Sequence, residues 1–258
     1  MTQALPFSLV GRTVMVTGAS SGLGAHFAGL CASAGANVVL GARRTNRIEQ
    51  IAAKLEAAGG KAVAVPLDVA DEASTIAAFD TAIRHFGAVD SIIANAGTSA
   101  SGRSVDTVVD GLRTMFDTNL LGVYLTAREG ARRLIAADSR TRGHGRIVLI
   151  GSITADMTGQ GDAGYAASKA AVAHLGRNFA REWVRHGINV NVVQPGFVRT
   201  ELSADWFDSP GGTDFIAGLH RRRLLDVESL DAMILYLCSD ASRQMTGATL
   251  TIDDGQHF

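Results

Sequence analysis

Short runs of apolar and β-branched residues alternate with longer segments of helical periodicity along this chain. Seven runs have the length and composition of strands, at residues 13–16, 37–40, 62–65, 91–94, 146–150, 189–193 and 249–252. Six helical segments separate them, and the two longest cover 105–137 and 164–186. Apolar strands separated by helices of ten or more residues indicate a parallel sheet with helices on both faces. The pattern therefore predicts a doubly wound α/β fold.

Composition and charge narrow the class of protein. At 258 residues and 47% hydrophobic composition, the chain is expected to form one domain over residues 1–258. The 24 basic and 25 acidic residues favour a small-molecule substrate over nucleic acid or an anionic membrane surface. We expect no signal peptide, no membrane helix and a cytoplasmic location. Cys31 and Cys238 are expected to be buried thiols, and the seven histidines lack the spacing of a metal site.

A glycine-rich stretch follows the first expected strand and precedes a helix. Glycines at such a place let the chain turn tightly and let backbone N–H groups and the helix N-terminus approach a pyrophosphate. The spacing Gly-x-x-x-Gly-x-Gly also fits an ordinary turn between a strand and a helix. Its position after the first strand favours a dinucleotide site. The candidate binding residues are Gly18, Ser20, Ser21, Gly22, Leu23 and Gly24.

The residues after the second strand distinguish between the two nicotinamide dinucleotides. An NAD site usually has an Asp or Glu about 20 residues beyond the glycines, to bind the ribose hydroxyl. No acidic residue lies between Ala25 and Ile48, and the strand is followed by Arg43 and Arg44. A guanidinium binds a 2′-phosphate through paired N–H donors. We therefore predict NADP(H), although both arginines would also fit as solvated residues at the start of the next helix.

Polar and small residues also follow the other strands, at the edge where ligands bind in such sheets. Asp68-Val69 follow the third strand, and Asp68 is placed either to accept from an adenine amino group or to cap the next helix. Asn95-Ala96-Gly97 follow the fourth strand, where small residues admit a ribose and Asn95 can also bridge strands. Pro195-Gly196 break the sixth strand, so that Val198 and Thr200 either cover the ligand or form a plain loop.

Four further side chains are candidates for catalysis. If their segment is helical, Tyr165 and Lys169 stand one turn apart on the same face. A phenol has a pKa of about 10 in water, and a fixed positive charge such as that of Lys169 would stabilise its phenolate. Ser152 follows the fifth strand. Asn119, in an apolar stretch, predicts either a kinked helix whose amide binds a water or a polar position on an exposed face.

Together these motifs resemble the short-chain dehydrogenase/reductase superfamily in its form of about 250 residues. The resemblance extends from about Gly11 to Gly255 and keeps the order of the family's motifs. It implies a single-domain Rossmann fold with strand order 3-2-1-4-5-6-7. It also implies a tetrad: Tyr165 as the acid/base, Ser152 at the substrate oxygen, Lys169 on the nicotinamide ribose while lowering the pKa of the tyrosine, and Asn119 positioning a water relay. The chain departs from the usual pattern at Ala94, and at 253–256, where Asp-Gly-Gly is more usual.

The expected function is that of an NADPH-dependent carbonyl reductase or secondary alcohol dehydrogenase. Aromatic residues in a substrate lid at about 200–225 favour a ketone with an apolar flank. A rival is a 3-oxoacyl-thioester reductase, whose anionic substrate or carrier would contact Arg221-Arg222-Arg223 or the arginines at 132, 133, 140 and 142. A rival of another class is a non-catalytic NADP(H)-sensing protein. The two long helices are apolar on more than one face, which favours a homotetramer.

Overall fold

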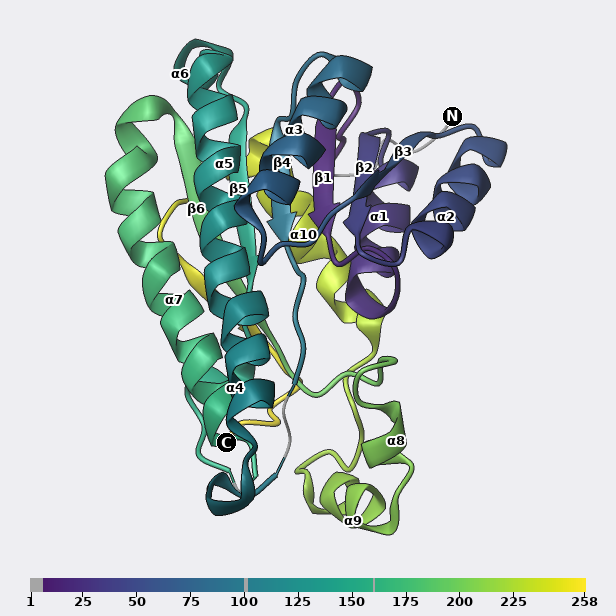
Figure 1. Ribbon diagram of the computed structural model, residues 1–258, viewed down its shortest axis with the longest axis vertical. Helices are drawn as coiled ribbons and strands as arrows, with labels where there is room; N and C mark the ends of the chain where they lie inside the picture. The colour runs from purple at the N-terminus through teal and green to yellow at the C-terminus, as the bar shows by residue number, and fades with distance from the viewer. Residues whose placement is uncertain (1–6, 100–101, 160) are drawn as a thin grey trace.

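The computed structural model of the protein describes residues 7–99, 102–159 and 161–258. Its strands form one parallel sheet in the order β3-β2-β1-β4-β5-β6-β7, which confirms the predicted fold (Figure 1). The strands are β1 (Thr13–Thr17), β2 (Asn37–Ala42), β3 (Lys61–Pro66), β4 (Ser91–Ala94), β5 (Gly145–Ile150), β6 (Ile188–Pro195) and β7 (Thr249–Ile252). The strand order changes direction between β1 and β4, and ligands of doubly wound folds bind outside the carboxyl ends of strands at this point.

The helices connect successive strands, as the periodicity predicts. They are α1 (Gly22–Ser33), α2 (Thr45–Ala57), α3 (Glu72–Phe86), α4 (Val109–Phe116), α5 (Gly122–Ala136), α6 (Ser139–Arg142), α7 (Ala163–Trp183), α8 (Ala204–Phe207), α9 (Pro210–Gly218) and α10 (Asp231–Cys238). Short 3₁₀ turns are η1 (Ser104–Asp106), η3 (Ile153–Ala155), η4 (Val184–His186), η5 (Val227–Leu230) and η6 (Asp240–Ser242). In Figure 1, α8 and α9 lie apart from the other helices, beyond the carboxyl edge of the sheet.

The core consists of two apolar clusters, one on each face of the sheet. Successive residues of β1 point to opposite faces, so that Val14 belongs to one cluster and Met15 to the other. On the first face Phe27 of α1 packs with residues of α2 and α10, and on the second Phe79 of α3 packs with residues of α5 and α7. Burying each large apolar side chain contributes about 1.5–3 kcal/mol. The sheet is thus held rigid from both sides while its carboxyl edge stays open.

The helix expected over 105–137 is interrupted. It begins at Val109, and a π-helical segment, η2 (Asp117–Leu121), joins α4 to α5, with the N–H of Gly122 bonded to the carbonyl of Asp117. One extra residue in a turn rotates the side chains that follow, and Asn119, inside this segment, is fully buried. The prediction of an irregular helix around Asn119 is therefore confirmed. The alternative, in which Asn119 lies on an exposed face, is wrong.

The sixth strand continues further than expected. β6 includes Pro195, whose Cα lies opposite Ile252 of β7, and the chain turns only at Gly196. Proline is tolerated here because it is the last residue of the strand. Cys31 and Cys238 are buried free thiols, as expected. Within the described residues, no helix is long and apolar enough to cross a membrane, and no three His, Cys, Asp or Glu side chains are grouped to hold a metal ion.

Candidate active site

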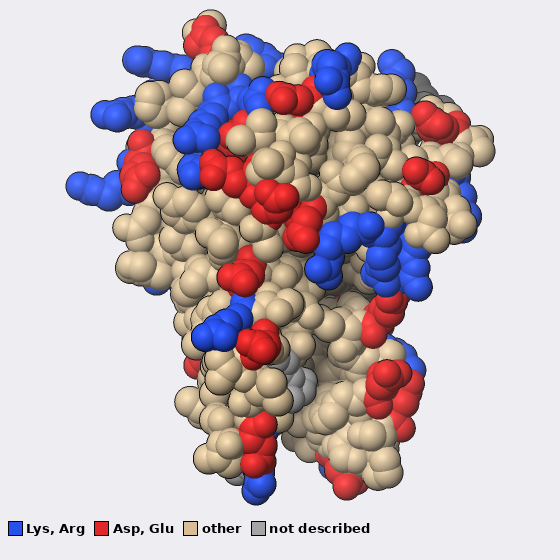
Figure 2. Space-filling model, viewed as in Figure 1, with Lys and Arg blue, Asp and Glu red and all other residues tan. Residues whose placement is uncertain are grey.

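A cavity of about 810 Å³ lies at the carboxyl edge of the sheet and is bordered by α8 and α9. Figure 2 shows the surface hollowed there, below a group of Lys and Arg side chains. Nearly all of the predicted site residues line this cavity: Gly18, Ser20, Ser21, Gly22, Leu23, Arg43, Arg44, Asp68, Val69, Asn95, Ala96, Gly97, Ser152, Tyr165, Lys169, Pro195, Gly196, Val198 and Thr200. The other two, Gly24 and Asn119, lie behind its wall.

The glycine-rich loop is packed too closely for larger residues. Gly18 has a φ of +68°, and a Cβ there would lie 2.7 Å from the Cα of Ala96. A Cβ on Gly24 would lie 2.3 Å from the carbonyl oxygen of Gly18. The side chain of Asn95 donates to the carbonyl of Thr17 at 3.0 Å, so it bridges β4 and β1, as one reading of the sequence had it. No side chain caps the N-terminus of α1, so its backbone donors fit a pyrophosphate.

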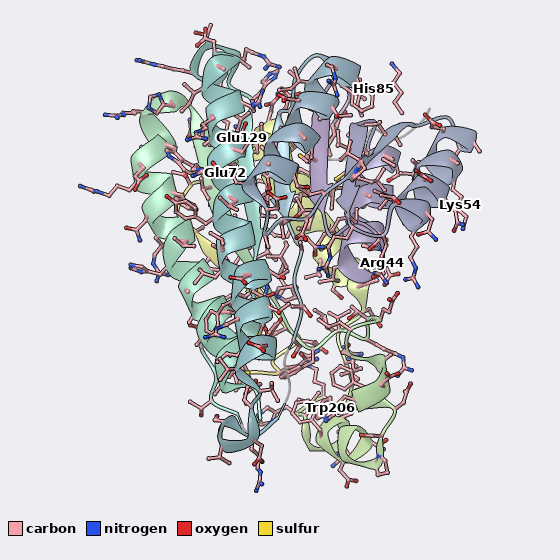
Figure 3. All side chains as sticks on the ribbon, in the orientation of Figure 1. Arg44, Lys54, Glu72, His85, Glu129 and Trp206 are labelled. Carbon is pink, nitrogen blue, oxygen red and sulfur yellow. The ribbon has the colours of Figure 1, made fainter. Side chains whose placement is uncertain are left out.

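Two arginines line the end of the cavity beside this loop. Arg44 donates to the hydroxyls of Ser20 at 3.0 Å and Ser21 at 2.6 Å, and it forms an ion pair with Glu201. It is therefore not a simple solvated residue (Figure 3). Arg43 is exposed at the rim and forms no ion pair with any residue that the structure describes. Its guanidinium donors are thus available to a ligand, whereas those of Arg44 are already engaged.

Glu201 closes this end of the cavity from the opposite side. Its two carboxylate oxygens pair with Arg44 and, at 2.5 Å, with Arg47. The hydrogen bonds from these two arginines hold the pKa of Glu201 below its usual value. The ion pairs therefore join the start of α2 to the chain that follows β6.

Asp68 does not cap a helix. Its Oδ1 accepts from the backbone N–H of Ala70 at 3.1 Å, while α3 is capped by Asp71, which accepts from Ala73 at 2.8 Å. The capping alternative for Asp68 is therefore wrong, because the residue three positions later has the extended backbone and the side-chain bond of an N-cap. Asp68 instead lies in the cavity wall.

The hydroxyl of Ser152 is fixed by its neighbour Thr154. The Oγ of Ser152 accepts from the Thr154 backbone N–H at 3.2 Å and from the Thr154 hydroxyl at 3.0 Å. With these two bonds accepted, the remaining polar function of the serine oxygen is to donate its own proton. Ser152 donates this proton to the oxygen of Tyr165, and because both Ser152 and Tyr165 line the cavity, a substrate oxygen between them can accept it instead.

Helix α7 brings Tyr165 and Lys169 together, as their spacing predicts. The Nζ of Lys169 lies 5.6 Å from the centre of the Tyr165 ring and donates to the carbonyl oxygen of Ile150 at 3.0 Å. Lys169 is 4% exposed, and burial lowers its pKa to about 8. An ammonium has three donors, so Lys169 retains two for another partner.

The expected lowering of the tyrosine pKa by Lys169 is wrong for this structure. Burial raises the pKa of Tyr165, a hydrogen bond with Ser152 lowers it, and the charge of Asp162 raises it, with a net rise. The physical reason is that removing water from the phenol disfavours its anion, while Lys169 donates to a backbone carbonyl.

Asn119 supports this site from behind. Its amide donates to the carbonyl of Thr98 at 2.9 Å and to the hydroxyl of Ser168 at 3.2 Å, and its Oδ1 accepts from the N–H of Thr98 at 2.8 Å. Both amide donors thus have protein partners, so a water bound by this side chain would have to donate to Oδ1, and the expected water relay stays a prediction. Asn119 therefore ties the π-helical segment to α7 and to the loop after β4.

Aromatic side chains line the other end of the cavity. They are Phe197, Trp206, Phe207 and Phe215, with ring centres 5.0 Å apart between Trp206 and Phe215 and 4.9 Å apart between Phe197 and Phe215. In Figure 3, Trp206 lies between α8–α9 and the sheet, well away from Arg44. One end of the cavity is therefore cationic and the other apolar.

The segment that carries these rings is held by residues near the C-terminus. The Oε1 of Gln256 accepts from the N–H of Phe197 at 2.6 Å, and its Nε2 donates to the carbonyl of Arg223 at 3.2 Å. Arg221 and Arg223 each form an ion pair with Asp254 at 2.8 Å. Two members of the arginine run are thus engaged within the protein.

The other arginines considered for a thioester substrate lie far from the cavity. Arg132 and Arg133 are near the end of α5, both paired with Glu129, and Arg140 and Arg142 are in α6. Figure 1 shows α6 at the opposite end of the molecule from α8 and α9.

Among the cavity residues to which sequence reasoning gave no role of their own are Thr154, Asp162, Phe197 and Glu201. Two of them have a sequence feature that could have pointed to the site. Thr154 carries a hydroxyl two residues after Ser152, and Asp162 is an acid at the start of the helix that carries Tyr165. Glu201 had none, because its partner Arg44 is 157 residues away in the sequence.

Residues 12–211, which include the glycine-rich loop, Ser152, Tyr165 and Lys169, match a family model described as short chain dehydrogenase. The chain belongs to the short chain dehydrogenase family. As a short chain dehydrogenase, it is an oxidoreductase that acts on alcohol or carbonyl groups with a nicotinamide dinucleotide. The resemblance seen in the sequence is thereby confirmed.

This short chain dehydrogenase has named relatives along its whole length. It is similar to oxidoreductase UcpA of Salmonella typhimurium, with 33% identity over 255 residues, covering 96% of this chain and 95% of UcpA. It is 35% identical over 260 residues to 3beta-hydroxysteroid dehydrogenase 1 of Eggerthella lenta, covering 96% and 94% of the two chains. A solved gluconate 5-dehydrogenase from Burkholderia cenocepacia, in complex with NADP and tartrate, matches with a TM-score of 0.90 and 32% identity, covering 97% of this chain and 96% of that one.

Proposed function

We propose that this chain is an NADPH-dependent reductase of ketones that carry an apolar flank. The observation that carries the proposal is the convergence of Ser152, Tyr165 and Lys169 in one cavity whose opposite end is lined by Arg43. The side chains of Ser152, Tyr165 and Lys169 suit the reduction of a carbonyl group by hydride transfer. The guanidinium of Arg43 suits the binding of a phosphate. The dinucleotide would extend along the cavity between these two ends.

The reaction transfers two electrons as a hydride and one proton. Bound NADPH supplies the hydride to the carbonyl carbon. Tyr165 gives its phenolic proton to the carbonyl oxygen, and the hydroxyl of Ser152 donates a hydrogen bond to the same oxygen as negative charge develops there. The products are a secondary alcohol and NADP⁺. Lys169, with donors left over from its bond to Ile150, would bind the ribose hydroxyls of the nucleotide.

The protonation state of Tyr165 is the one that reduction of a ketone requires. Because burial and the charge of Asp162 disfavour the phenolate, Tyr165 is a protonated donor at neutral pH. The oxidation of an alcohol would instead need the phenolate as a base, and so a higher pH. We therefore expect the optimum for oxidation at a higher pH than that for reduction.

Arg43 supports NADP(H) over NAD(H). A carboxylate after β2 would accept from the ribose hydroxyl of NAD, but the buried Ala42 is followed here by an exposed arginine without an ion pair among the described residues. The related gluconate 5-dehydrogenase was solved in complex with NADP, which agrees with this choice.

Replacing Arg43 tests the cofactor proposal. Arg43→Ala should weaken NADPH binding roughly tenfold to a hundredfold, because a charge-assisted hydrogen bond is lost, and should leave NADH binding nearly unchanged. Lys54→Ala is the matched control, since it removes an exposed positive charge from the same helix region outside the cavity (Figure 3). Fluorescence titration of both cofactors gives the dissociation constants, and an equal loss for NADPH and NADH would contradict the choice of NADP(H).

The aromatic end of the cavity supports an apolar substrate flank. Residues at about 200–225 carry Trp206, Phe207 and Phe215, and we propose that they form a lid over the substrate within a single domain. The Eggerthella relative is a hydroxysteroid dehydrogenase, whose substrate is a large apolar ring system. Reduction of sugar-like ketones in preference to aryl and alkyl ketones would count against this substrate class.

A homotetramer remains part of the proposal. Leu121 and Tyr124, 43% and 40% exposed, lie at the junction of α4 and α5, and Ile135 lies at the other end of α5. Apolar side chains exposed along one long helix support its packing against a second copy. Light scattering tests the assembly, and a monomeric mass would refute it.

A further inference from the structure

Asp162 is an acid in the cavity wall whose role the proposed reaction does not explain. It precedes α7 and lines the cavity together with Tyr165. It occupies the N-cap position of the helix, yet its side chain makes no capping hydrogen bond. Its Oδ1 is buried and has no hydrogen-bond partner among the described residues. A buried carboxylate oxygen without a donor is costly, and the other oxygen, Oδ2, likewise has no hydrogen bond or ion pair among the described residues. Because Asp162 lines the cavity, Oδ2 is the oxygen with which it can accept a hydrogen bond from a ligand.

The charge of Asp162 is not neutralised within the cavity. Among the described residues that line it, the positively charged ones are Arg43, Arg44 and Lys169. The two arginines lie at the other end, beside the glycine-rich loop, and Lys169 donates to the carbonyl of Ile150. Asp162 is close enough to the phenol of Tyr165 for its charge to act on that group. The substrate end of the cavity thus combines aromatic rings with one free carboxylate.

We propose that Asp162 is a specificity-determining residue that accepts a hydrogen bond from an O–H or N–H group of the substrate, at a distance from the reacting carbonyl. The inference rests on the proposed function and names its substrate class more closely. The substrate is a ketone on an apolar ring system with a second, hydrogen-bond-donating group. Substrates with a carboxylate at that place are rejected, because two like charges would face each other at the apolar end of the cavity.

A set of aryl ketones with one shared skeleton tests this inference. The probes are acetophenones that carry a hydroxyl, an aminomethyl, a methyl or a carboxylate group at the meta or para position. The measurement is kcat/KM with NADPH for the wild type, Asp162→Asn and Asp162→Ala. Asp156→Asn is the matched control, because Asp156 is an exposed acid of the same connection and does not line the cavity.

The wild type should prefer the hydroxyl and aminomethyl ketones to the methyl ketone and should use the carboxylate ketone least. Asp162→Ala should lower kcat/KM for the donor-bearing ketones roughly tenfold to a hundredfold relative to kcat/KM for the methyl ketone, because any effect through the pKa of Tyr165 is common to all four ketones and cancels in this ratio. Asp162→Asn should raise kcat/KM for the carboxylate ketone roughly tenfold, since it removes the like charge. The two donor probes distinguish a hydroxyl from an ammonium, because only the ammonium should suffer strongly in the Asn variant.

Two outcomes would overturn the inference. If Asp162→Asn and Asp162→Ala lower kcat/KM for all four ketones by the same factor, Asp162 has a structural role only. If neither variant changes the ratio of kcat/KM between any two of the four ketones, the carboxylate of Asp162 does not contact the substrate. In both cases the wild type still reduces ketones, and the proposed function stands. A wild type that reduces none of the ketones would instead contradict the proposed function, and the inference with it.

Discussion

Replacing Lys169 with methionine should make the protein more stable while damaging its function. The ordinary lysine pKa of 10.5 falls to about 8 in the folded chain because the ammonium is buried. That difference corresponds to about 3 kcal/mol of unfavourable free energy at neutral pH, where the buried group is charged. Methionine has a similar stem and no charge, so it avoids this cost. It also loses the hydrogen bond to Ile150, which offsets about 1 to 2 kcal/mol of the gain.

The net expectation is that Lys169→Met is about 1 to 2 kcal/mol more stable than the wild type at pH 7. The advantage should shrink as the pH rises from 8 towards 10.5. In that window the folded wild type has already lost the proton from Lys169, whereas the unfolded chain still binds it, so the stability of the wild type rises with pH. Methionine does not titrate, so the stability of the Lys169→Met variant does not rise with pH in this way.

Urea unfolding at a fixed protein concentration, followed by tryptophan fluorescence from pH 7 to 10, measures both effects. Lys54→Met is the control, because it makes the same substitution at a lysine that is exposed and not buried. The reasoning is refuted if Lys169→Met is less stable than the wild type at pH 7, or if the difference between them is the same at pH 7 and pH 10. The same variant should lose both NADPH affinity and turnover, since the ammonium is absent.

Three other substitutions test separate parts of the site. Tyr165→Phe should leave the dissociation constant of NADPH nearly unchanged and reduce ketone turnover by roughly a hundredfold or more; retained turnover would exclude Tyr165 as the acid. Thr154→Val removes the hydroxyl that orients Ser152 and should slow turnover roughly fivefold to twentyfold without changing the KM for NADPH, and Thr154→Ser should restore the rate. Glu201→Gln weakens the ion pair with Arg44 and should tighten NADPH binding by roughly twofold to fivefold, with no change for NADH; weaker NADPH binding would show that the pair supports the site.

The fold and the position of the glycine-rich loop at the cavity were predictable because their signals are local. Each strand is a short run rich in apolar and β-branched residues, and the residues from Gly18 to Gly24 are neighbours in the sequence, so backbone geometry alone relates them. The spacing of Tyr165 and Lys169 likewise needed only a helix, which α7 provides. What the spacing could not give was the electrostatics, since the pKa of Tyr165 depends on how much water the surrounding chain removes.

Features that depend on packing between distant segments were not predictable. A single π-turn shifts the apolar pattern of a helix by only one residue, so the burial of Asn119 stayed open until the turn at Asp117–Leu121 was seen. The ion pair of Arg44 with Glu201 joins residues 157 positions apart, and no sequence pattern near either residue predicts it. The unpartnered oxygen of Asp162 is also a property of its surroundings and not of its sequence.

The bonds of Gln256 also bear on how substrate preference changes in evolution and in the laboratory. One side chain joins the N–H of Phe197 to the carbonyl of Arg223, beside the backbone bond from the N–H of Leu225 to the carbonyl of Phe197. Its replacement, for example by a shorter side chain, would leave the sequence of the cavity wall unchanged and still remove two of the bonds that hold the ends of the connection that carries the aromatic rings. Libraries aimed at new substrates should therefore include position 256, which a search limited to cavity-lining residues would pass over.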